Sequence, residues 1–268
     1  MKGRVLIVAG SDSGGGAGIQ ADIKTVTALG GFAMTAITAL TAQNTLGVTA
    51  IHEVPPDFVA EQMRVVLRDL GADAVKLGML HSPQIIDVVR ETLDAEAPDV
   101  PLVVDPVMVA KGGAKLLRDD AMAALKEKMI PGAAVITPNL PEAEVLCGQT
   151  ADDRESFRRL GTALTRLGAG AVLLKGGHLP GDTVVDLLLA GEGPPLVFED
   201  TRIESRHTHG TGCTLASAVA TGIAQGIPLR QAVTRARAYV RQAMMTAPGL
   251  GQGHGPLNHA HTVRPFGG

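Results

Sequence analysis

Short, almost purely apolar segments alternate with amphipathic segments along most of this 268-residue chain. A strand that is apolar on both faces must be buried on both faces, so this alternation predicts a mostly parallel central sheet with helices on either side. Strands are expected at 5–9, 33–40, 74–77, 102–104, 134–136 and 171–174, and helices at 18–29, 57–70, 83–94, 119–129 and 154–167.

The pattern changes after residue 182. Two extended runs within 182–203 flank a Gly- and Pro-containing turn and predict an antiparallel hairpin. Helices are expected at 211–225 and 229–245, and the tail from Pro248 is expected to be irregular. Because no linker, repeat or charge block divides the chain, we expect a single three-layer α/β/α domain over residues 1–268.

Composition excludes several classes of partner. The chain carries 24 Lys and Arg against 27 Asp and Glu, and it has one Tyr, five Phe and no Trp, so it lacks the basic surface and stacking rings of a nucleic-acid binder. Its two cysteines, Cys147 and Cys213, cannot build a disulfide framework and suit a reducing compartment. The uncharged stretches 25–52 and 207–229 contain many polar residues, and the apolar run at the start is too short for a signal peptide. We therefore expect a cytoplasmic protein without a membrane span.

Glycine is abundant, with 33 residues, and much of it follows the predicted strands, where parallel sheets bind ligands. The first such segment, residues 10–18, can bring backbone N–H groups close to an anion or another polar ligand. It lacks the Lys of a Walker A loop and the spacing of a dinucleotide fingerprint. A flexible turn is the alternative interpretation.

The second glycine-rich segment is Gly210-Thr211-Gly212-Cys213, at the start of a predicted helix. Its amides would form a backbone site for a phosphate or an oxyanion, and the helix dipole adds positive potential. A thiol in this position is expected to have a pKa below its free value of about 8.5 and to act as a nucleophile or proton acceptor. A buried thiol beside a tight turn explains the same residues, and the sequence leaves both interpretations open.

Polar side chains follow three other predicted strands. Asn139 and Glu142 form a capping box, or offer oxygen ligands to Mg²⁺, or do both. Asp105 ends an apolar strand and needs a cation, a metal or a ligand, whereas Lys175 suits either a phosphate or an ion pair. Gly112-Gly113 would let the loop after Asp105 move as a lid.

Taken in order, these segments resemble the ribokinase-like superfamily, and within it the hydroxymethylpyrimidine kinase/phosphomethylpyrimidine kinase family of thiamine biosynthesis. The resemblance extends over nearly the whole chain, and Gly210-Thr211-Gly212-Cys213-Thr214 is its most specific motif, because sugar kinases of the superfamily carry Asp at the position of Cys213. The other matching motifs are residues 9–22, Thr41-Ala42-Gln43-Asn44, Asp105-Pro106-Val107-Met108 and residues 251–256.

The resemblance implies two successive phosphoryl transfers from Mg²⁺-bound ATP, to the hydroxymethylpyrimidine and then to its monophosphate, by a protein that forms homodimers. Gln43, Asp22, Gly10, Met79 and Val107 would surround the pyrimidine. Cys213 would accept the hydroxyl proton, while the amides of Gly210, Thr211, Gly212 and Cys213 stabilise the transferring phosphoryl group. Lys175, Thr137, Asn139 and Thr208 would bind ATP, and Glu142 and Asp105 would hold Mg²⁺ or its waters.

Three alternatives remain. Some relatives that phosphorylate pyridoxal carry a second Cys in the lid, and the segment around Lys111-Gly112-Gly113-Ala114 has none, which makes a pyridoxal or pyridoxine kinase the second choice. A catalytically silent pyrimidine-binding regulator would not need both halves of a transfer site. A cysteine hydrolase would need His207 or His209 beside Cys213; these histidines are otherwise expected to be solvated or hydrogen-bonded, since no third metal ligand accompanies them.

Overall fold

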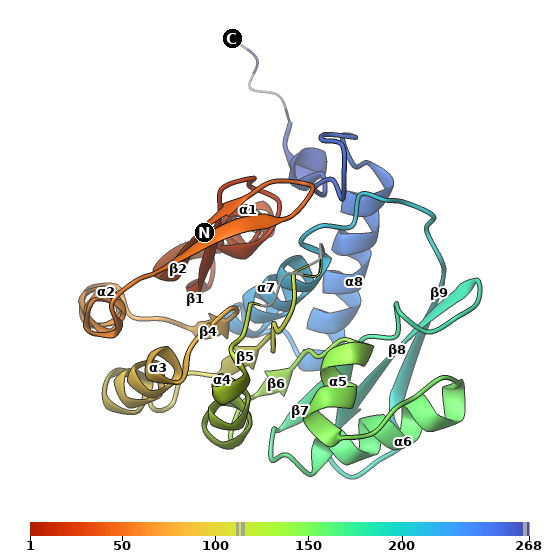
Figure 1. The fold of residues 1–268 in the computed structure, drawn as a ribbon, viewed down its shortest axis with the longest axis horizontal. Helices are drawn as coiled ribbons and strands as arrows, with labels where there is room; N and C mark the ends of the chain where they lie inside the picture. The colour runs from red at the N-terminus through yellow and green to blue at the C-terminus, as the bar shows by residue number, and fades with distance from the viewer. Residues whose placement is uncertain (111–112, 114–115, 265–266, 268) are drawn as a thin grey trace.

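The structure is a computed structural model that describes residues 1–110, 113, 116–264 and 267, and a nine-stranded sheet forms its centre (Figure 1). The strand order is β3-β2-β1-β4-β5-β6-β7-β8-β9. The strands are β1 (Arg4–Asp12), β2 (Phe32–Gln43), β3 (Val48–Glu53), β4 (Ala74–Leu77), β5 (Leu102–Val104), β6 (Val135–Ile136), β7 (Ala171–Leu174), β8 (Thr183–Ala190) and β9 (Leu196–Thr201).

The central strands are parallel and the edges are antiparallel. β1 pairs in parallel with β2 and β4, and the parallel pairing continues through β5 and β6 to β7. β3 at one edge and the β8–β9 hairpin at the other are antiparallel. The expected parallel sheet and hairpin are both confirmed. The carboxyl ends of the parallel strands therefore meet at one edge of the sheet, the edge at which ligands bind in such folds.

Helices cover both faces of the sheet (Figure 1). Alternate residues of β1 enter two separate cores: Leu6 and Val8 face one, and Val5 and Ile7 face the other. The first core is closed by α2 (Pro56–Asp69), α3 (Pro83–Glu96), α4 (Asp119–Ala124), η1 (Leu125–Met129), α5 (Leu140–Cys147) and α6 (Arg154–Thr165). The second is closed by α1 (Gly18–Ala28), α7 (Thr211–Ala224) and α8 (Leu229–Met245). The three-layer α/β/α architecture is confirmed.

The boundaries differ from expectation at several places. α5 was not among the expected helices, and β1 continues to Asp12, three residues past its predicted end. β3 was not expected, because most of its residues are exposed and an edge strand is held by pairing rather than by an apolar pattern. β2 continues to Gln43, three residues past its predicted end. The helix expected at 119–129 changes from α4 to the π-helical turn η1, and a short 3₁₀ helix, η2 (His259–Thr262), lies in the tail.

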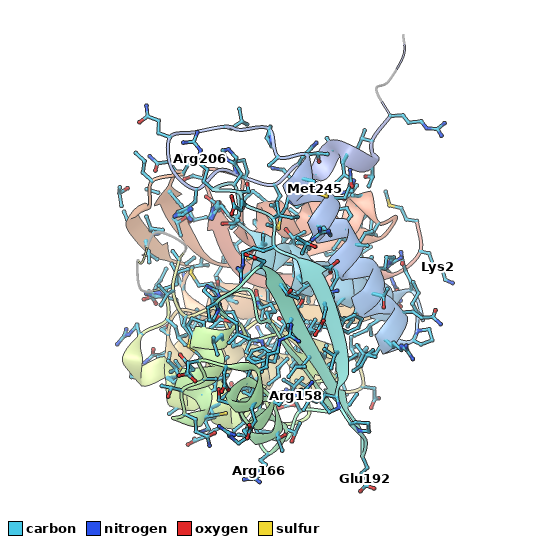
Figure 2. The ribbon with its side chains drawn as sticks, turned by 90° about the vertical axis from the view of Figure 1, so that its right-hand side faces the viewer. Lys2, Arg158, Arg166, Glu192, Arg206 and Met245 are labelled. Atoms are coloured by element: carbon cyan, nitrogen blue, oxygen red, sulfur yellow. The ribbon has the colours of Figure 1, made fainter. Side chains whose placement is uncertain are left out.

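The hairpin runs from the middle of the molecule to one end (Figure 2). Its turn, which carries Glu192, lies at one end, and the segment that follows β9, which carries Arg206, lies at the other (Figure 2). The chain thus returns to the ligand-binding edge of the sheet just before α7 begins. Within the described residues, no helix combines the length and apolar character that a membrane span requires.

Candidate active site

A pocket of about 960 Å³ lies where the parallel strands end. It is lined by the segments that follow β1, β4, β5, β6 and β7 and by the start of α7, and it extends between β9 and α8. The site residues expected from the sequence line this pocket, except Asp22 and Thr137. A cavity of this size suits a nucleotide together with a small second substrate.

The start of α7 projects its backbone amides into the pocket. Gly210 precedes the helix in the left-handed conformation, with φ +83°, and a Cβ there would lie 1.9 Å from the carbonyl oxygen of Gly16, so only glycine fits. Among the hydrogen bonds of the described residues, none takes the amide of Gly210, Gly212 or Cys213 as donor. These free donors and the helix dipole form an anion site made of backbone.

The thiol of Cys213 does not have the acidity predicted for it. Burial raises its pKa to about 12, nearby Asp22 and Asp105 act in the same direction, and Lys76 only partly opposes them. The prediction of a lowered pKa is therefore wrong. Removal from water outweighs the helix terminus, because a thiolate loses hydration that the surrounding groups do not replace.

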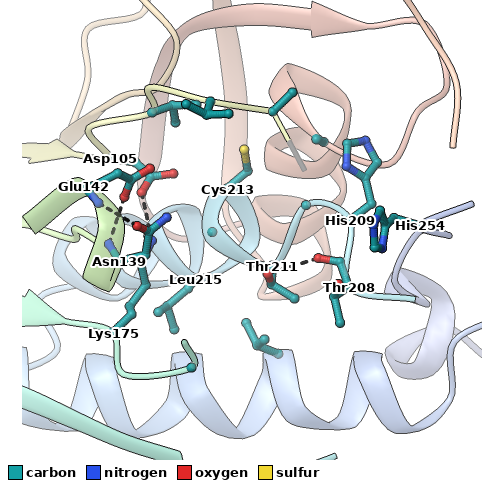
Figure 3. Close-up of a pocket in the computed structure, with 18 of the residues that line it drawn as sticks. Asp105, Asn139, Glu142, Lys175, Thr208, His209, Thr211, Cys213, Leu215 and His254 are labelled. Atoms are coloured by element: carbon teal, nitrogen blue, oxygen red, sulfur yellow. Dashed lines mark hydrogen bonds and ion pairs between the residues drawn. The ribbon is translucent and has the colours of Figure 1, made fainter. Parts of the chain in front are cut away.

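A cation and carboxylates gather on one side of the α7 start (Figure 3). Lys175 Nζ lies 3.2 Å from Asp105 Oδ1, which also accepts a 3.0 Å hydrogen bond from the Thr137 hydroxyl. Thr137 is buried behind Asp105 rather than exposed to the pocket, because its hydroxyl is used to orient that carboxylate. A Cβ on Gly212 would lie 3.4 Å from Lys175 Nζ and 3.5 Å from Asp105 Oδ2, so this cluster faces the anion site directly.

Asn139 and Glu142 form the predicted capping box at the start of α5. The Glu142 amide donates to Asn139 Oδ1 at 2.9 Å, and the Asn139 amide donates to Glu142 Oε2 at 2.8 Å. Burial raises the pKa of Glu142 to about 7, with Asp105 adding to the effect and Lys175 opposing it. A bound cation would relieve the crowding of the two acids.

The donor set is compatible with Mg²⁺. Asp105, Glu142 and Asn139 supply only hard oxygen atoms. Within the described residues, no group of three or more His, Cys, Asp or Glu side chains forms a complete cation site. A magnesium ion here would therefore keep several waters and take further oxygens from the nucleotide, as this ion commonly does.

Asp22 lies behind the pocket wall. It is fully buried, forms a 2.9 Å ion pair with Lys76 and accepts a 2.7 Å hydrogen bond from Ser217. The expected contact of Asp22 with the pyrimidine ring is therefore corrected: its two oxygens are occupied, and it reaches the pocket only through Lys76, which does line it. Lys76 was not among the site residues expected from the sequence. A lysine inside the apolar strand Ala74–Leu77 was the available signal, since a buried ammonium requires a partner.

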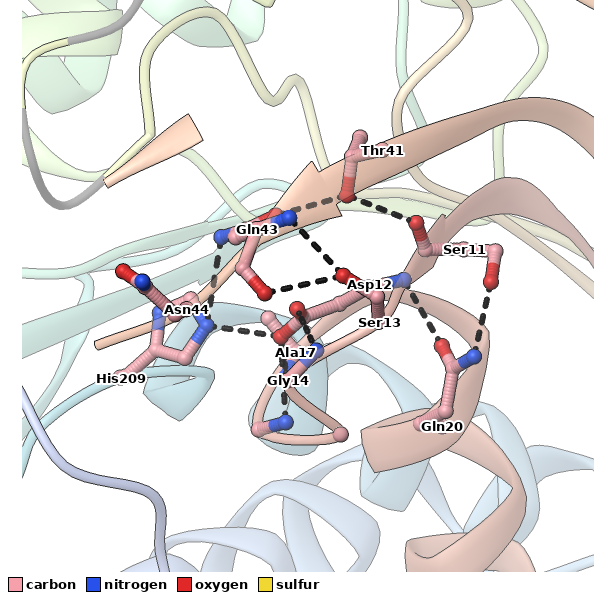
Figure 4. Close-up of polar contacts among 12 residues, drawn as sticks. Ser11, Asp12, Ser13, Gly14, Ala17, Gln20, Thr41, Gln43, Asn44 and His209 are labelled. Carbon is pink, nitrogen blue, oxygen red and sulfur yellow. Dashed lines mark hydrogen bonds and ion pairs between the residues drawn. The ribbon is translucent and has the colours of Figure 1, made fainter. Parts of the chain in front are cut away.

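The glycine-rich loop after β1 binds an anion that belongs to the protein itself (Figure 4). The amides of Gly14, Gly16 and Ala17 donate to the Asp12 carboxylate at 2.8, 3.1 and 2.8 Å. Their predicted use for a bound ligand is thus excluded while Asp12 occupies them. The same loop nevertheless borders the pocket through Gly10 and Gly18.

The expected pyrimidine contacts lie at this end of the pocket. Gln43 lies at the end of β2, and the Thr41 hydroxyl oxygen is 3.0 Å from its Oε1 and 2.9 Å from the Ser11 carbonyl oxygen. A Cβ on Gly10 would lie 2.4 Å from Met79 Cε, so these two residues touch and form one wall. Val107 and Thr208 also line the pocket. The structure therefore brings the residues expected around the pyrimidine, other than Asp22, to one end of the cavity.

The histidines do not support a hydrolase. His209 is buried, and its Nε2 lies 2.8 Å from Asp12 Oδ2, which confirms the hydrogen-bonded interpretation. Neither His207 nor His209 forms a hydrogen bond to Cys213 within the described part of the chain, so the base that a hydrolase needs is not in place. The predicted lid at Gly112-Gly113 falls largely outside the described residues.

Comparison with known proteins agrees with the resemblance seen in the motifs. The family model for phosphomethylpyrimidine kinase matches residues 12–258. The chain is 54% identical over 258 residues to the thiamine biosynthesis bifunctional protein ThiED of Geobacter sulfurreducens, which covers 96% of this chain but only 52% of that protein, so the chain spans about half of that relative. It is 49% identical to the hydroxymethylpyrimidine/phosphomethylpyrimidine kinase of Rhizobium meliloti, with 96% of each chain covered.

Solved structures show the same fold. The ADP complex of Bacillus subtilis pyridoxal kinase superposes with a TM-score of 0.89 at 34% identity, covering 97% of this chain and 98% of that one. The phosphomethylpyrimidine kinase of Clostridium difficile superposes with a TM-score of 0.79 at 40% identity, covering 90% and 99%. The chain therefore belongs to the phosphomethylpyrimidine kinase family, and its fold and enzyme class are those of a ribokinase-like kinase.

Proposed function

We propose that this protein transfers phosphoryl groups from ATP to 4-amino-5-hydroxymethyl-2-methylpyrimidine and then to its monophosphate, in thiamine biosynthesis. One observation carries the proposal: the amides of Gly210, Gly212 and Cys213 are free, and Gly212 lies beside Lys175 and Asp105, in the same pocket that contains Gln43. A pyrimidine site and a phosphate site thus share one cavity. The names of the relatives support the substrate, and the ADP complex of a solved relative supports the nucleotide.

Phosphoryl transfer mainly requires positioning and stabilisation of charge. The amides at the start of α7 and the ammonium of Lys175 stabilise negative charge on the transferring group, and Asn139 and Thr208 orient ATP. Gln43 binds the aminopyrimidine edge, with Gly10, Met79 and Val107 around the ring. Mg²⁺, held through Glu142 and Asp105, neutralises phosphate charge when it is bound.

The role of Cys213 follows from its pKa. A proton acceptor must be a thiolate, and a thiol whose pKa is raised to about 12 supplies little thiolate at neutral pH. A loose transition state needs little help from a base, because the attacking hydroxyl keeps its proton until late. We therefore expect the Cys213 thiol to hydrogen-bond to the hydroxymethyl group rather than to accept its proton, which passes late in the transfer to an oxygen of the transferred phosphoryl group, so Cys213→Ser should retain more activity than Cys213→Ala.

The remaining features of the proposal concern the whole protein. We expect residues 1–268 to act as one kinase domain, as a homodimer and in the cytoplasm, where ATP and reduced cysteines are available. These expectations follow from the resemblance and the two free cysteines. Light scattering during gel filtration measures the mass in solution, and a monomer of 27.6 kDa would contradict the dimer.

The deciding experiment measures ADP release with the hydroxymethylpyrimidine, its monophosphate or pyridoxal as the acceptor. Turnover of both pyrimidines supports the proposal, and the lack of ADP release with either of them would overturn it. Similarity to a solved pyridoxal kinase makes pyridoxal phosphorylation the second candidate, and faster turnover of pyridoxal than of the pyrimidines would favour it.

A further inference from the structure

Residues 251–256, which we term the C-terminal clasp, lie in a loop that leaves the end of α8 and returns to it. At the point of return, the Asn258 amide donates to the Ala243 carbonyl of α8 at 3.0 Å. The next residue, His259, is buried, and its Nδ1 lies 3.1 Å from the Tyr239 hydroxyl, also on α8. The clasp is therefore part of an Ω-type loop with a fixed base, and loops of this class often carry function. The phosphoryl transfer proposed above assigns it none.

One side of the clasp is hydrogen-bonded to the turn between β2 and β3. The His254 amide donates to the Thr45 carbonyl at 2.8 Å, and the Gly253 amide donates to the Thr45 hydroxyl at 3.3 Å. A Cβ on Gly253 would lie 2.1 Å from the Thr45 carbonyl oxygen and 3.2 Å from Leu46 Cα. Gly253 does not have a positive φ, so glycine is required here because the two backbones touch and not because of its own conformation.

The other side of the clasp is attached to the segment that leads into α7. The Gly255 carbonyl accepts a 3.1 Å hydrogen bond from the His209 amide, and His209 forms an isolated parallel bridge with Pro256. A Cβ on Gly255 would lie 2.2 Å from His207 Nδ1 and 2.7 Å from the Leu250 carbonyl oxygen, so a larger residue does not fit. His209 directly precedes the first residue of the backbone anion site, and this attachment therefore fixes where that site begins.

The clasp also reaches the pocket and the loop after β1. His254 lines the pocket (Figure 3). A Cβ on Gly16 would lie 3.2 Å from Pro256 Cβ, so Pro256 packs against the glycine-rich loop. The clasp thus contacts three segments that come from different parts of the chain and border the cavity, namely the turn 44–46 that follows Gln43, the loop 14–17 and the segment 207–209.

We propose that the C-terminal clasp is a positioning element for phosphoryl transfer: it connects the turn that follows Gln43 to the start of α7 and so fixes the gap between the acceptor hydroxyl and the transferring phosphoryl group. The inference rests on the proposed function, which places the acceptor at one of these ends and the phosphoryl group at the other. A misplacement of about 1 Å between reacting groups costs on the order of 10²-fold in rate, so a small shift of either attachment has a measurable effect.

Two glycine variants open the clasp, one on each side. Gly253→Ala displaces it from Thr45, and Gly255→Ala displaces it from the segment before α7. We expect kcat for the hydroxymethylpyrimidine to fall about tenfold or more in each variant, and both KM values to stay within about threefold, because each substrate keeps its own contacts and only their alignment changes. Gly47→Ala is the matched control: it lies in the same β2–β3 turn, has no atom within 4 Å of its Cβ and should keep the wild-type kcat.

A count of intact sites separates misalignment from partial unfolding. Calorimetric titration with AMP-PCP, a non-hydrolysable ATP analogue, should give about one site per chain in both variants and in wild type. A loss of sites in proportion to the fall in kcat would show that the clasp supports the fold rather than the alignment, and it would overturn the positioning role.

A double variant tests whether the two sides act as one connection. Because either substitution breaks the same connection, Gly253→Ala combined with Gly255→Ala should be no slower than the slower single variant. If the two losses in kcat multiply instead, the two glycines act independently, and the clasp does not connect the two ends of the pocket.

The outcomes separate the inference from the function beneath it. If wild-type protein does not phosphorylate the pyrimidine, the proposed function and the role of the clasp both fall. If wild-type protein is active but both single variants keep the wild-type kcat, or raise a KM value without lowering kcat, only the role of the clasp is overturned.

Discussion

Two glycine-rich turns border the pocket, and they differ in what their amides bind. In the turn after β1, the amides of Gly14, Gly16 and Ala17 donate to Asp12. In the turn before α7, the amides of Gly210 and Gly212 have no acceptor within the described residues. Both turns precede a helix. A glycine-rich turn therefore becomes a ligand site only where the chain does not provide its own anion.

The charges around the two turns follow the same division. Asp12 places a negative charge inside the first turn, whereas Lys175 places a cation opposite the second. An incoming phosphate would be repelled by the first and attracted by the second. The first turn is thus suited to holding the pocket in shape, and the second to binding the transferring group.

The largest expected effect comes from forcing the two turns apart. In Gly210→Ala the new Cβ would collide with the Gly16 carbonyl oxygen at 1.9 Å while the backbone is held at φ +83°. We expect kcat/KM to fall by at least about 10²-fold, as for other displaced sites, together with a lower Tm. Gly226→Ala has a similar φ of +74° with no atom within 4 Å, so it isolates the cost of the backbone conformation. Equal activity in the two variants would contradict a functional role for the contact between the two turns.

A smaller effect should follow from adding a methyl group at Gly212, at the start of α7, where it does not displace the backbone. A Cβ on Gly212 makes ordinary contacts at 3.4 Å with Lys175 Nζ and 3.5 Å with Asp105 Oδ2. Because Ala also favours a helix, we expect the Tm of Gly212→Ala to be unchanged or higher, while kcat/KM for ATP falls about thirtyfold. Gly47→Ala, in open space away from the pocket, is the control. Undiminished activity would show that no anion sits against Gly212.

Removing the Asp12 carboxylate from the turn after β1 should affect the stability of the fold more than catalysis. Asp12→Ala leaves the loop amides and His209 without their acceptor, and we expect the free energy of unfolding to fall by about 2 kcal/mol at neutral pH. Since the native pKa of Asp12 is lowered, its contribution is present above the unfolded carboxyl pKa of about 4 and is lost as the pH falls below it. Urea unfolding across that range should show the variant and wild type converging in acid. Asp99→Ala, at an exposed turn, should show no such convergence.

The smallest expected effect concerns the Cys213 thiol at the start of α7, which we expect to lack the reactivity of an acidic cysteine. With its pKa raised to about 12, Cys213 should react slowly with iodoacetamide at pH 8 or so, and the pH profile of kcat should have no thiol limb near the free-cysteine pKa of about 8.5. Mass spectrometry of labelling rates in a Cys147→Ser background makes this measurable. A labelling plateau below pH 9 or so would mean that the helix terminus outweighs burial.

Most of the fold could be predicted from local patterns. Strands buried on both faces leave continuous apolar runs, so β4, β5 and β7 were found at their observed bounds. β3 left no such run because it lies at an exposed edge. Parallel topology also predicts which residues meet, since strand ends share one edge of the sheet. Asp105, after β5, and Lys175, after β7, come together for that reason.

The sequence by itself determined the layers of the fold, the position of the pocket and the residue types around it, because these depend on burial pattern and chain direction. Only the tertiary structure decided which of the two glycine-rich turns keeps its backbone amides free for a ligand. Asp12 meets His209 from 197 residues away, and Lys76 meets Asp22 from 54 residues away. The state of the Cys213 thiol was decided in the same way: its helix terminus is a local feature, but the burial that raises its pKa is created by distant parts of the chain packing around it.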